Sequence, residues 1–476
     1  MNERMTGWLT AAACLAAAGV SWVWWFGYSS GRALETRREP PAPAAAAQAE
    51  ERIDLRGQFE TFDGKPSTLT NAWPRFRGAA YDNVSRDPTP LADRWPAEGP
   101  PVLWSVALGE GYAGAAVWEG RVYVMDYDEA RQGDALRCFS LDDGREIWRR
   151  WYRVRVKRNH GMSRTVPAVA DGVAVAIGPR CHVLCVDARS GDFKWGFDLA
   201  KEFGAEVPMW YTGQCPLVED GVAVLVPAGR VLALGVDVRD GRVLWQTPNP
   251  RGWRMSHASP MPVRIGERRL YAYCAIGGIA GIAADGPERG ALLWETAEWN
   301  HAVVAPSPVP LPDGRLFVTA GYGAGSRMLR VRERAGAYAV ESLFALDRRV
   351  FACEQHTPVY YRGHLFGVLP ADAGANKQQL VCLTLDGAVK WTSGVENRYG
   401  LGPFMIADDK LLVLEDNGRL TLAAADPDRF VKLAEARVLH GVEAWAPLAL
   451  AGGRLLARDR QRMVCLDLRA QGRGGN

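Results

Sequence analysis

The sequence predicts an all-β fold, an eight-bladed β-propeller made of four-stranded blades. One supporting observation is a turn whose glycine is followed four residues later by a large apolar residue. This turn recurs at intervals of roughly 50 residues, a period typical of solenoids and propellers. A second is a proline-led apolar strand that precedes each turn. A third is that the last repeat lacks one strand, while a spare strand precedes the first repeat.

Each copy of the turn motif reads as a strand, a tight turn and a second strand. In Cys185–Trp195, an apolar strand ends at Asp187, Gly191 lies in the turn, and Trp195 follows. Asp bonds to nearby backbone and glycine accepts a positive φ, so the turn fixes the face on which the tryptophan lies. We therefore expect such residues to anchor the packing of the blades. They are Trp104, Trp148, Trp195, Trp245, Trp294 and Trp391, with Phe344 and Leu433 in two degenerate copies.

The second landmark supplies the remaining strands of each unit. In Val166–Val169 and in Cys215–Val218, a proline leads into a short apolar strand, a turn with glycine and aspartate, and another strand. The unit has none of the 3.6-residue periodicity that a helical repeat needs. Four short strands in each unit indicate a propeller blade.

The two ends of the repeat region predict how the ring closes. Ala446–Leu468 holds only three strands, whereas Pro101–Val106 forms a strand that belongs to no complete unit. We expect this N-terminal strand to pair with the three C-terminal strands, because that pairing leaves no open sheet edge at the seam. Counted in this way, the repeats make eight blades.

With these motifs, the chain resembles the pyrroloquinoline quinone (PQQ)-binding-like β-propeller repeat family. That family includes the outer-membrane assembly factor B-like propellers and is similar in its repeat to quinoprotein alcohol dehydrogenases. The resemblance covers roughly residues 73–468 and implies that each docking tryptophan packs against the neighbouring blade. Trp73–Gly78 resembles a lead-in that many single-propeller members carry. Function varies widely among proteins of one fold, so the resemblance implies the fold more firmly than an activity.

Three regions are predicted along the chain. Residues 1–38 are expected to hold a cytoplasmic stub and a transmembrane signal anchor, residues 39–72 a Pro/Ala-rich linker and lead-in, and residues 73–476 the propeller. Met5–Gly31 contains no charged residue and is long enough to span a bilayer. A cleaved signal peptide is an alternative, because Ala16–Ala18 offers a cleavage site, and lipidation of Cys14 is another.

The predicted location is the bacterial inner membrane, with a single pass and the propeller in the periplasm. The positive charges do not favour this orientation, because Arg4 precedes the apolar run whereas Arg32, Arg37 and Arg38 follow it. The periplasmic placement is therefore only what the family resemblance implies.

Composition and cysteine spacing exclude several classes of function. The chain is 48% hydrophobic and 23% charged with a net charge of +3, so no bulk attraction to nucleic acid is expected. The nine cysteines include no Cys-x-x-Cys pair, which argues against a disulfide framework or a zinc site. Cys138, Cys185, Cys382 and Cys465 occupy equivalent strand positions and are expected to be small core residues.

The connections between blades are the expected functional site, because they surround the mouth of the central channel. Their polar and aromatic side chains could bind a ligand if they converge; otherwise each satisfies local backbone groups. The candidate ligand-binding residues are His160, Arg164, Trp210, Tyr211, Trp253, His257, Trp299, His301, Gln355, His356, Arg398, Tyr399 and Trp445. The same connections also contain Tyr112, Gln214, Glu354 and His440. No metal site is expected, because closely spaced histidine pairs are absent.

These residues favour a non-enzymatic binding or assembly scaffold whose partner is an envelope protein or peptide. The alternative is a PQQ- and Ca²⁺-dependent quinoprotein dehydrogenase that oxidises an alcohol or sugar. Such enzymes resemble one another in a Ca²⁺ site of carboxylate and amide oxygens and in an aspartate general base. The acids of the channel-mouth connections are all glutamates, and the adjacent cysteine pair of those enzymes is absent. We therefore predict no catalytic residue and no cofactor. A propeller that binds no ligand is a third possibility.

A run of six cations lies between Arg149 and Arg158. Its alternating part, Arg153–Lys157, is expected to form an outer strand with one solvated face. A basic ledge for an anionic lipid, glycan or protein is the alternative interpretation.

Overall fold

The computed structural model describes residues 16 and 53–470, and the predicted membrane anchor lies outside this range except for Ala16. The compact unit that contains the propeller begins at Ile53. A strand within the predicted lead-in, residues 53–72, pairs with the first blade. In the described part of the chain, no helix has both the length and the apolar character needed to cross a membrane.

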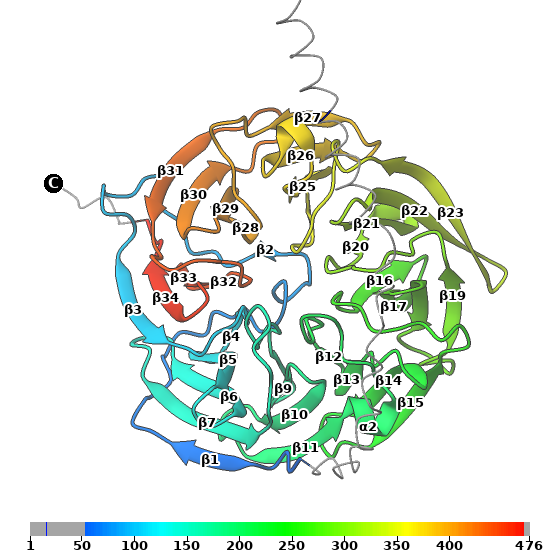
Figure 1. Cartoon of the computed structure of the whole chain (residues 1–476), viewed down its shortest axis with the longest axis horizontal. Helices are drawn as coiled ribbons and strands as arrows, with labels where there is room; N and C mark the ends of the chain where they lie inside the picture. Colours follow the sequence, from blue (N-terminus) through cyan, green and yellow to red (C-terminus); the bar gives the residue numbers. More distant parts are fainter. Residues whose placement is uncertain (1–15, 17–52, 471–476) are drawn as a thin grey trace, which may run out of the picture. The chain divides into compact units, whose positions relative to one another are not determined.

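Eight sheets surround a central channel (Figure 1), which confirms the predicted all-β, eight-bladed propeller. Blade 1 comprises β4 (Ala115–Trp118), β5 (Arg121–Asp128), β6 (Gly133–Ser140) and β7 (Glu146–Arg153), and blade 2 comprises β8 (Ala168–Ala170), β9 (Val173–Ile177), β10 (His182–Asp187) and β11 (Phe193–Asp198). Blade 3 comprises β12 (Leu217–Glu219), β13 (Val222–Leu225), β14 (Val231–Asp237) and β15 (Val243–Pro248). Blade 4 comprises β16 (Met261–Ile265), β17 (Arg268–Ala275), β18 (Gly278–Ala283) and β19 (Leu292–Thr296). Blade 5 comprises β20 (Val309–Pro310), β21 (Arg315–Ala320), β22 (Gly325–Arg334) and β23 (Ala337–Leu346). Blade 6 comprises β24 (Val359–Tyr361), β25 (His364–Val368), β26 (Leu380–Thr384) and β27 (Val389–Thr392). Blade 7 comprises β28 (Phe404–Ala407), β29 (Lys410–Leu414), β30 (Arg419–Ala424) and β31 (Lys432–Arg437). Blade 8 comprises β32 (Ala449–Ala451), β33 (Arg454–Arg458), β34 (Arg462–Asp467) and β3 (Val102–Ala107).

The helical elements within residues 53–470 are short. They are α2 (Leu199–Phe203), which follows β11, and the 3₁₀ turns η1 (Pro312–Gly314) and η2 (Gly374–Asn376). The middle strands are buried along their length, as in β9, whose five residues Val-Ala-Val-Ala-Ile are all buried. Outer strands such as β15 alternate between more and less exposed residues. This difference follows because neighbouring blades cover both faces of a middle strand, whereas the rim faces solvent.

Strand β3 is the outermost strand of blade 8. It pairs antiparallel with β34, with Trp104 opposite Cys465 and Ser105 opposite Val464. The first propeller strand in the sequence and the last therefore lie in one sheet, so blade 8 is built from both ends of the repeat region.

Four docking tryptophans, Trp104, Trp148, Trp195 and Trp245, pack on the turn glycine of the following blade. A Cβ atom on Gly191 would lie 2.7 Å from the indole of Trp148, and a Cβ atom on Gly241 would lie 2.7 Å from that of Trp195. Four indole N–H groups also donate to a carbonyl in the next blade: Trp104 to Leu141 at 3.0 Å, Trp148 to Arg189 at 3.1 Å, Trp195 to Val238 at 2.9 Å and Trp391 to Asp426 at 3.1 Å. The turn motif thus sets the spacing between blades.

Trp294 packs against the neighbouring blade without a turn glycine. Blade 5 replaces the short turn with a hairpin of two ten-residue strands, and a Cβ atom on its Gly336 would meet nothing within 4 Å. The Trp294 indole N–H has no hydrogen-bond partner among the described residues. The ring is instead buried in a cluster with Leu316 and Val318 of blade 5.

The lead-in runs across the channel and ties several blades together. Figure 1 shows its strand β2 (Val84–Ser85) near the centre of the ring. Trp73 forms a β-bridge with Val117 in blade 1, and the Arg75 guanidinium donates to the Val218 carbonyl at 2.8 Å. The Arg77 guanidinium donates to the Thr357 and Pro358 carbonyls, each at 2.9 Å. Strand β2 pairs with β28 in parallel register. Burial lowers the pKa of Arg77 to about 10, so this side chain remains cationic at neutral pH.

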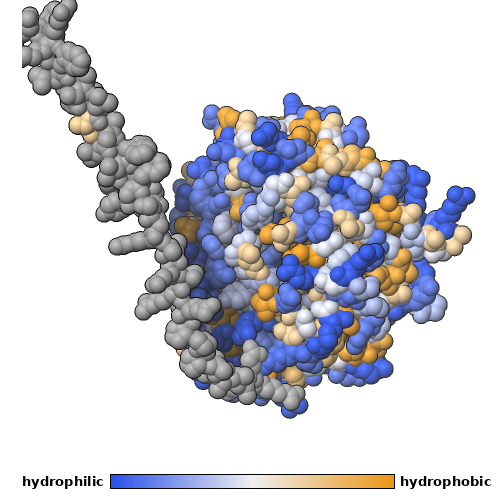
Figure 2. All heavy atoms as spheres, turned by 45° about the vertical axis from the view of Figure 1, so that its right-hand side comes forward, coloured by the Kyte–Doolittle hydropathy of each residue, from blue (hydrophilic) through white to orange (hydrophobic). Residues whose placement is uncertain are grey.

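A second added strand covers the rim of blade 1. β1 (Gln58–Thr61) pairs antiparallel with β7, and the Arg150 guanidinium lies over the Phe59 ring at 4.7 Å. β7 ends at Arg153, so the outer strand predicted over residues 153–157 is wrong beyond its first residue. The buried Val154 instead donates its N–H to the Gln132 carbonyl at 2.8 Å. On the face drawn in Figure 2, hydrophilic and hydrophobic residues are interspersed.

Candidate functional site

Seven of the eight connections between blades line one cavity of about 130 Å³ at the mouth of the channel. The turn between β21 and β22 adds Tyr322, and the lead-in adds Phe76. The lining residues are Phe76, Tyr112, Arg164, Trp210, Gly213, Cys215, His257, Val303, Ala305, Tyr322, Glu354, Gln355, His356, Trp445 and Pro447. Drug-sized ligand sites occupy roughly 300–1,000 Å³. This cavity has the size for a single side chain or a small group.

One wall is a stack of three rings from three different connections. The rings of Trp210 and Tyr322 are 5.9 Å apart with an interplanar angle of 21°, and those of Trp210 and His257 are 6.2 Å apart at 26°. Trp210, Tyr211 and Tyr322 all have left-handed backbone, with φ of 64°, 72° and 56°. Such values are uncommon for bulky residues, and strained residues of this kind cluster at functional sites.

Arg164 lies beside this stack with its charge unpaired. Its Nε donates to the Trp210 carbonyl at 2.5 Å, one terminal nitrogen donates to the His160 carbonyl at 2.7 Å, and the guanidinium lies 5.0 Å from the Tyr112 ring centroid. Among the described residues, no carboxylate lies within ion-pairing distance of this guanidinium. Burial lowers the pKa of Arg164. A partly buried cation held only by carbonyls and a ring has unused capacity for an anion.

The opposite wall contains Tyr112 and Trp445, whose rings are 5.0 Å apart. The Tyr112 hydroxyl donates to Glu443 at 2.5 Å, and burial together with that carboxylate raises the pKa of the tyrosine. The Trp445 indole N–H donates to Asp416 at 2.8 Å. Glu443 and Asp416 are therefore both engaged by aromatic side chains of this wall.

Asp416 corrects the prediction that the channel mouth has only glutamates. It follows β29 rather than lying in a connection between blades, which is why the sequence pattern did not reveal it. Burial raises its pKa, and it accepts the backbone N–H of Leu401 at 2.7 Å. Asp459 accepts the Gly441 N–H at 3.0 Å in the same way. Because the same kind of backbone contact occurs at both aspartates, we interpret Asp416 as a residue that fixes the loop containing Leu401.

The two histidines of the cavity are neutral at pH 7. Burial, aided by the charge of Arg164, lowers the pKa of His257 to about 4. Burial lowers the pKa of His356 to about 4 as well, and its Nε2 has no hydrogen-bond partner in the described structure. Burial raises the pKa of Glu354. The mouth therefore offers neutral imidazoles beside one unpaired guanidinium.

The structure brings together six of the thirteen predicted residues. They are Arg164, Trp210, His257, Gln355, His356 and Trp445. Phe76 and Tyr322 line the same cavity but were missed, because they come from the lead-in and from a turn within a blade. Bulky aromatic residues flanked by glycine, as in Gly321–Gly323, are the sequence signal that could have indicated Tyr322.

The other seven predicted residues do not line this cavity. Trp253, Trp299 and Tyr399 are buried in core clusters, where Trp253 packs on Gly277 and Gly278. The remaining four make contacts within or between nearby loops. The His301 ring packs edge-on against Trp299, with ring centroids 4.3 Å apart, and the His160 carbonyl accepts a hydrogen bond from Arg164. The Tyr211 hydroxyl and the Arg398 guanidinium donate to the carbonyls of Lys157 and Lys377, respectively. Large aromatic residues in these loops thus also complete the core.

Metal-binding side chains do not cluster among the described residues. Ca²⁺ takes six to eight oxygen ligands. Within residues 53–470, no group of three or more His, Cys, Asp or Glu residues is placed to hold a metal ion. Glu443 and Asp416 are already engaged by Tyr112 and Trp445.

Comparison with known proteins identifies propellers of one repeat type. A family model described as outer membrane protein assembly factor BamB matches residues 94–207 and 131–324. The quinoprotein alcohol dehydrogenase PedH of Pseudomonas putida is 29% identical over 171 residues, which cover 34% of this chain and 27% of that protein. The chain thus spans little more than a quarter of the length of this curated relative.

Two solved structures share the fold. Quinohemoprotein alcohol dehydrogenase ADHIIG from Pseudomonas putida HK5 matches with a TM-score of 0.54 and 11% identity, covering 85% of this chain and 82% of that one. BamB from Moraxella catarrhalis matches with a TM-score of 0.50 and 13% identity, covering 77% of this chain and 99% of that one. At such identities the likeness concerns the fold alone. Together with the repeated docking motif, the family-model match and the curated relative show that the chain is similar to the PQQ-like β-propeller family.

Proposed function

We propose that this propeller is a non-enzymatic binding scaffold whose channel-mouth cavity receives an acidic group of a partner protein. The observation that carries this proposal is the unpaired guanidinium of Arg164 beside the stack of Trp210, His257 and Tyr322. Trp, Tyr and Arg are the side chains that most often dominate binding energy at protein interfaces. A cavity of about 130 Å³ suits one inserted side chain.

The partner proposed is a protein or peptide of the bacterial cell envelope. The support is the match to a family described as an outer membrane protein assembly factor. We further propose that residues 5–31 tether the propeller to the inner membrane with the propeller in the periplasm. Cell fractionation, with protease treatment of intact spheroplasts, tests this placement. Digestion of the propeller only after cell lysis would contradict it.

The binding proposal is tested by quantitative mass spectrometry of proteins co-purified with the full chain from envelope membranes. Arg164→Gln and Trp210→Ala should each reduce recovery of the same partner at least tenfold, because each removes a main contact. Arg398→Gln is the matched control, since Arg398 lies in a connection of the same kind but outside the cavity. Equal recovery with all three variants would contradict the proposal.

A PQQ-dependent dehydrogenase is the second candidate, supported by the partial match to PedH. It is tested by incubating the purified chain with PQQ and Ca²⁺, removing free cofactor, and measuring retained absorbance and dye-linked oxidation of alcohols. Because Glu443 and Asp416 are already bonded to Tyr112 and Trp445, we expect neither retention nor turnover. Retention with turnover would replace the scaffold proposal.

A further inference from the structure

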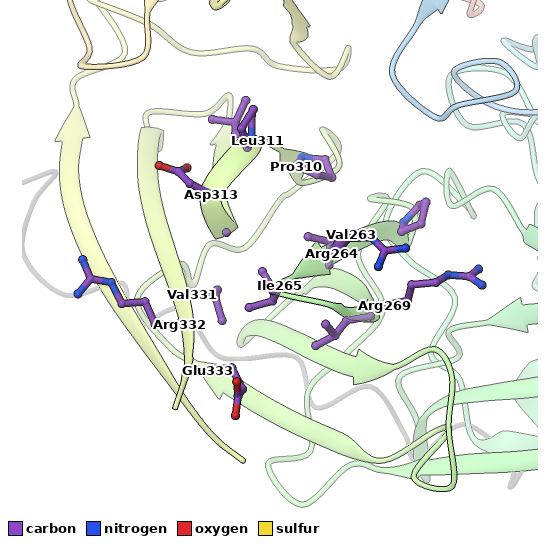
Figure 3. A pocket seen from close by; sticks show the side chains of 15 residues that line it. Val263, Arg264, Ile265, Arg269, Pro310, Leu311, Asp313, Val331, Arg332 and Glu333 are labelled. Carbon is purple, nitrogen blue, oxygen red and sulfur yellow. The ribbon is translucent and has the colours of Figure 1, made fainter. Parts of the chain in front are cut away.

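A groove of about 840 Å³ lies between blades 4 and 5, at the ends of the strands away from the channel-mouth cavity. One side is formed by residues 262–266 and the start of β17, the other by residues 310–314 and 331–333 of blade 5. Figure 3 shows Ile265 and Val331 facing the middle of the groove, with Arg332 on one side and Arg264 and Arg269 on the other.

The groove occurs where the repeat is interrupted. At this junction Trp294 has no turn glycine to pack on, because the β22–β23 hairpin projects from the rim (Figure 1). The first strand of blade 5 is only two residues long, and Pro310 and Pro312 cannot donate backbone N–H bonds. The described hydrogen bonds of the lead-in reach blades on both sides but neither blade 4 nor blade 5. Within residues 53–470, the lead-in therefore makes no hydrogen bond that would tie it across this surface.

The chemistry of the groove is apolar at its base and positive at its margin. Ile265, Leu311 and Val331 are between 1% and 6% exposed and form the base. Both lining acids are engaged within the protein: Asp313 pairs with Arg315 at 2.8 Å, and Glu333 accepts the Gly336 N–H at 2.6 Å.

The cations at the margin are less engaged. The exposed Arg264 contacts only the carbonyl of Glu267, at 2.9 Å, among the described residues. Arg332 has one distant acidic neighbour, Glu341 at 3.7 Å, and both side chains are more than half exposed. Exposed pairs of this kind contribute little, so both guanidinium groups are available to an acidic partner.

We infer that this groove is a second interaction surface, which binds an extended acidic segment of a partner protein with alternating apolar residues. Extended segments already bind the blades of this molecule, since β2 adds to β28 and β1 adds to β7. Alternate side chains of such a segment would lie on the apolar base, and carboxylates between them would reach Arg264 and Arg332. The inference does not depend on the channel-mouth cavity.

The test uses the purified propeller and a fluorescein-labelled octapeptide of alternating valine and glutamate, followed by fluorescence anisotropy. The double variant Arg264→Glu/Arg332→Glu should weaken binding at least tenfold, because it places like charges opposite the peptide. Arg429→Glu, an exposed reversal on blade 7, should leave binding within twofold, as should Arg164→Gln at the channel mouth. Bound peptide should also slow amide hydrogen exchange in residues 309–316.

Several results would overturn the inference. Equal binding of a valine–lysine octapeptide, or an unchanged affinity in the double variant, would show that binding does not depend on attraction between peptide carboxylates and the two guanidinium groups. Loss of peptide binding in Arg164→Gln alone would assign the peptide to the channel mouth. If phosphatidylglycerol vesicles bound through Arg264 and Arg332 while the peptide did not, the surface would be a lipid site.

Discussion

The Trp148 indole N–H donates to the Arg189 carbonyl at 3.1 Å, so the last strand of blade 1 is fixed to the turn of blade 2. The same indole lies against Gly191, where a Cβ atom would be 2.7 Å from the ring. Because equivalent contacts recur around much of the ring, they explain why a glycine and a tryptophan keep a constant spacing in the sequence.

Gly191→Ala should destabilise the propeller by about 2–4 kcal/mol, through strain at a positive φ and overlap with the Trp148 ring. Gly172→Ala is the matched control, because Gly172 has the same φ of 77° but nothing within 4 Å of its Cβ position. Urea unfolding of both variants measures the difference. Equal destabilisation would mean that the indole contact adds nothing beyond backbone strain.

Arg77→Ala should destabilise the fold by about 3–5 kcal/mol, because four backbone carbonyls lose a charged donor inside the channel. Arg77→Lys should recover only part of this loss, since an ammonium lacks the planar fork of the guanidinium. Urea unfolding midpoints provide the measurement. A variant as stable as wild type would show that the lead-in is not needed to hold the blades.

His257→Gln should make stability less dependent on pH between about 4 and 6.5. In the folded protein the pKa of His257 is lowered to about 4, so the unfolded chain binds a proton first as the pH falls from about 6.5. The stability from this histidine is present above that range and is lost toward pH 4. Unfolding free energies at pH 4.5 and 7 measure the slope, which the variant should reduce; an unchanged slope would contradict the burial of the imidazole.

Asp134→Asn should change the pH dependence in the opposite direction. Burial raises the pKa of Asp134 to about 7, and the Tyr152 hydroxyl lies 2.9 Å from its carboxyl oxygen. The stability from this carboxyl is greatest near pH 4 and is lost as the pH rises to about 7. The variant should therefore gain stability relative to wild type as the pH rises from 5 to 8. Parallel curves would show that Asp134 is ionised in the folded protein.

The repeats predicted the blades well because each depends on local turn chemistry. Gly191 and Trp195 identify a turn whose geometry is set within a few residues. The lead-in and the site were harder to predict, because Phe76 and Tyr322 reach the cavity through contacts between distant segments. Trp253 and Trp299 lie in core clusters, because an aromatic residue in a loop can also fill the core. Blade 5 was hard to predict for a different reason, because its long hairpin replaces the turn that Trp294 would meet.

The most direct test of the channel mouth as a binding site is site-specific photo-crosslinking in envelope membranes. A photoreactive residue at Tyr322, which lines the cavity and is 58% exposed, is compared with one at Val395, which is 66% exposed and does not line the cavity. We predict a discrete protein adduct at position 322 alone, which disappears when Arg164 is changed to Gln. No adduct at 322, or one that persists without the Arg164 guanidinium, would contradict the account.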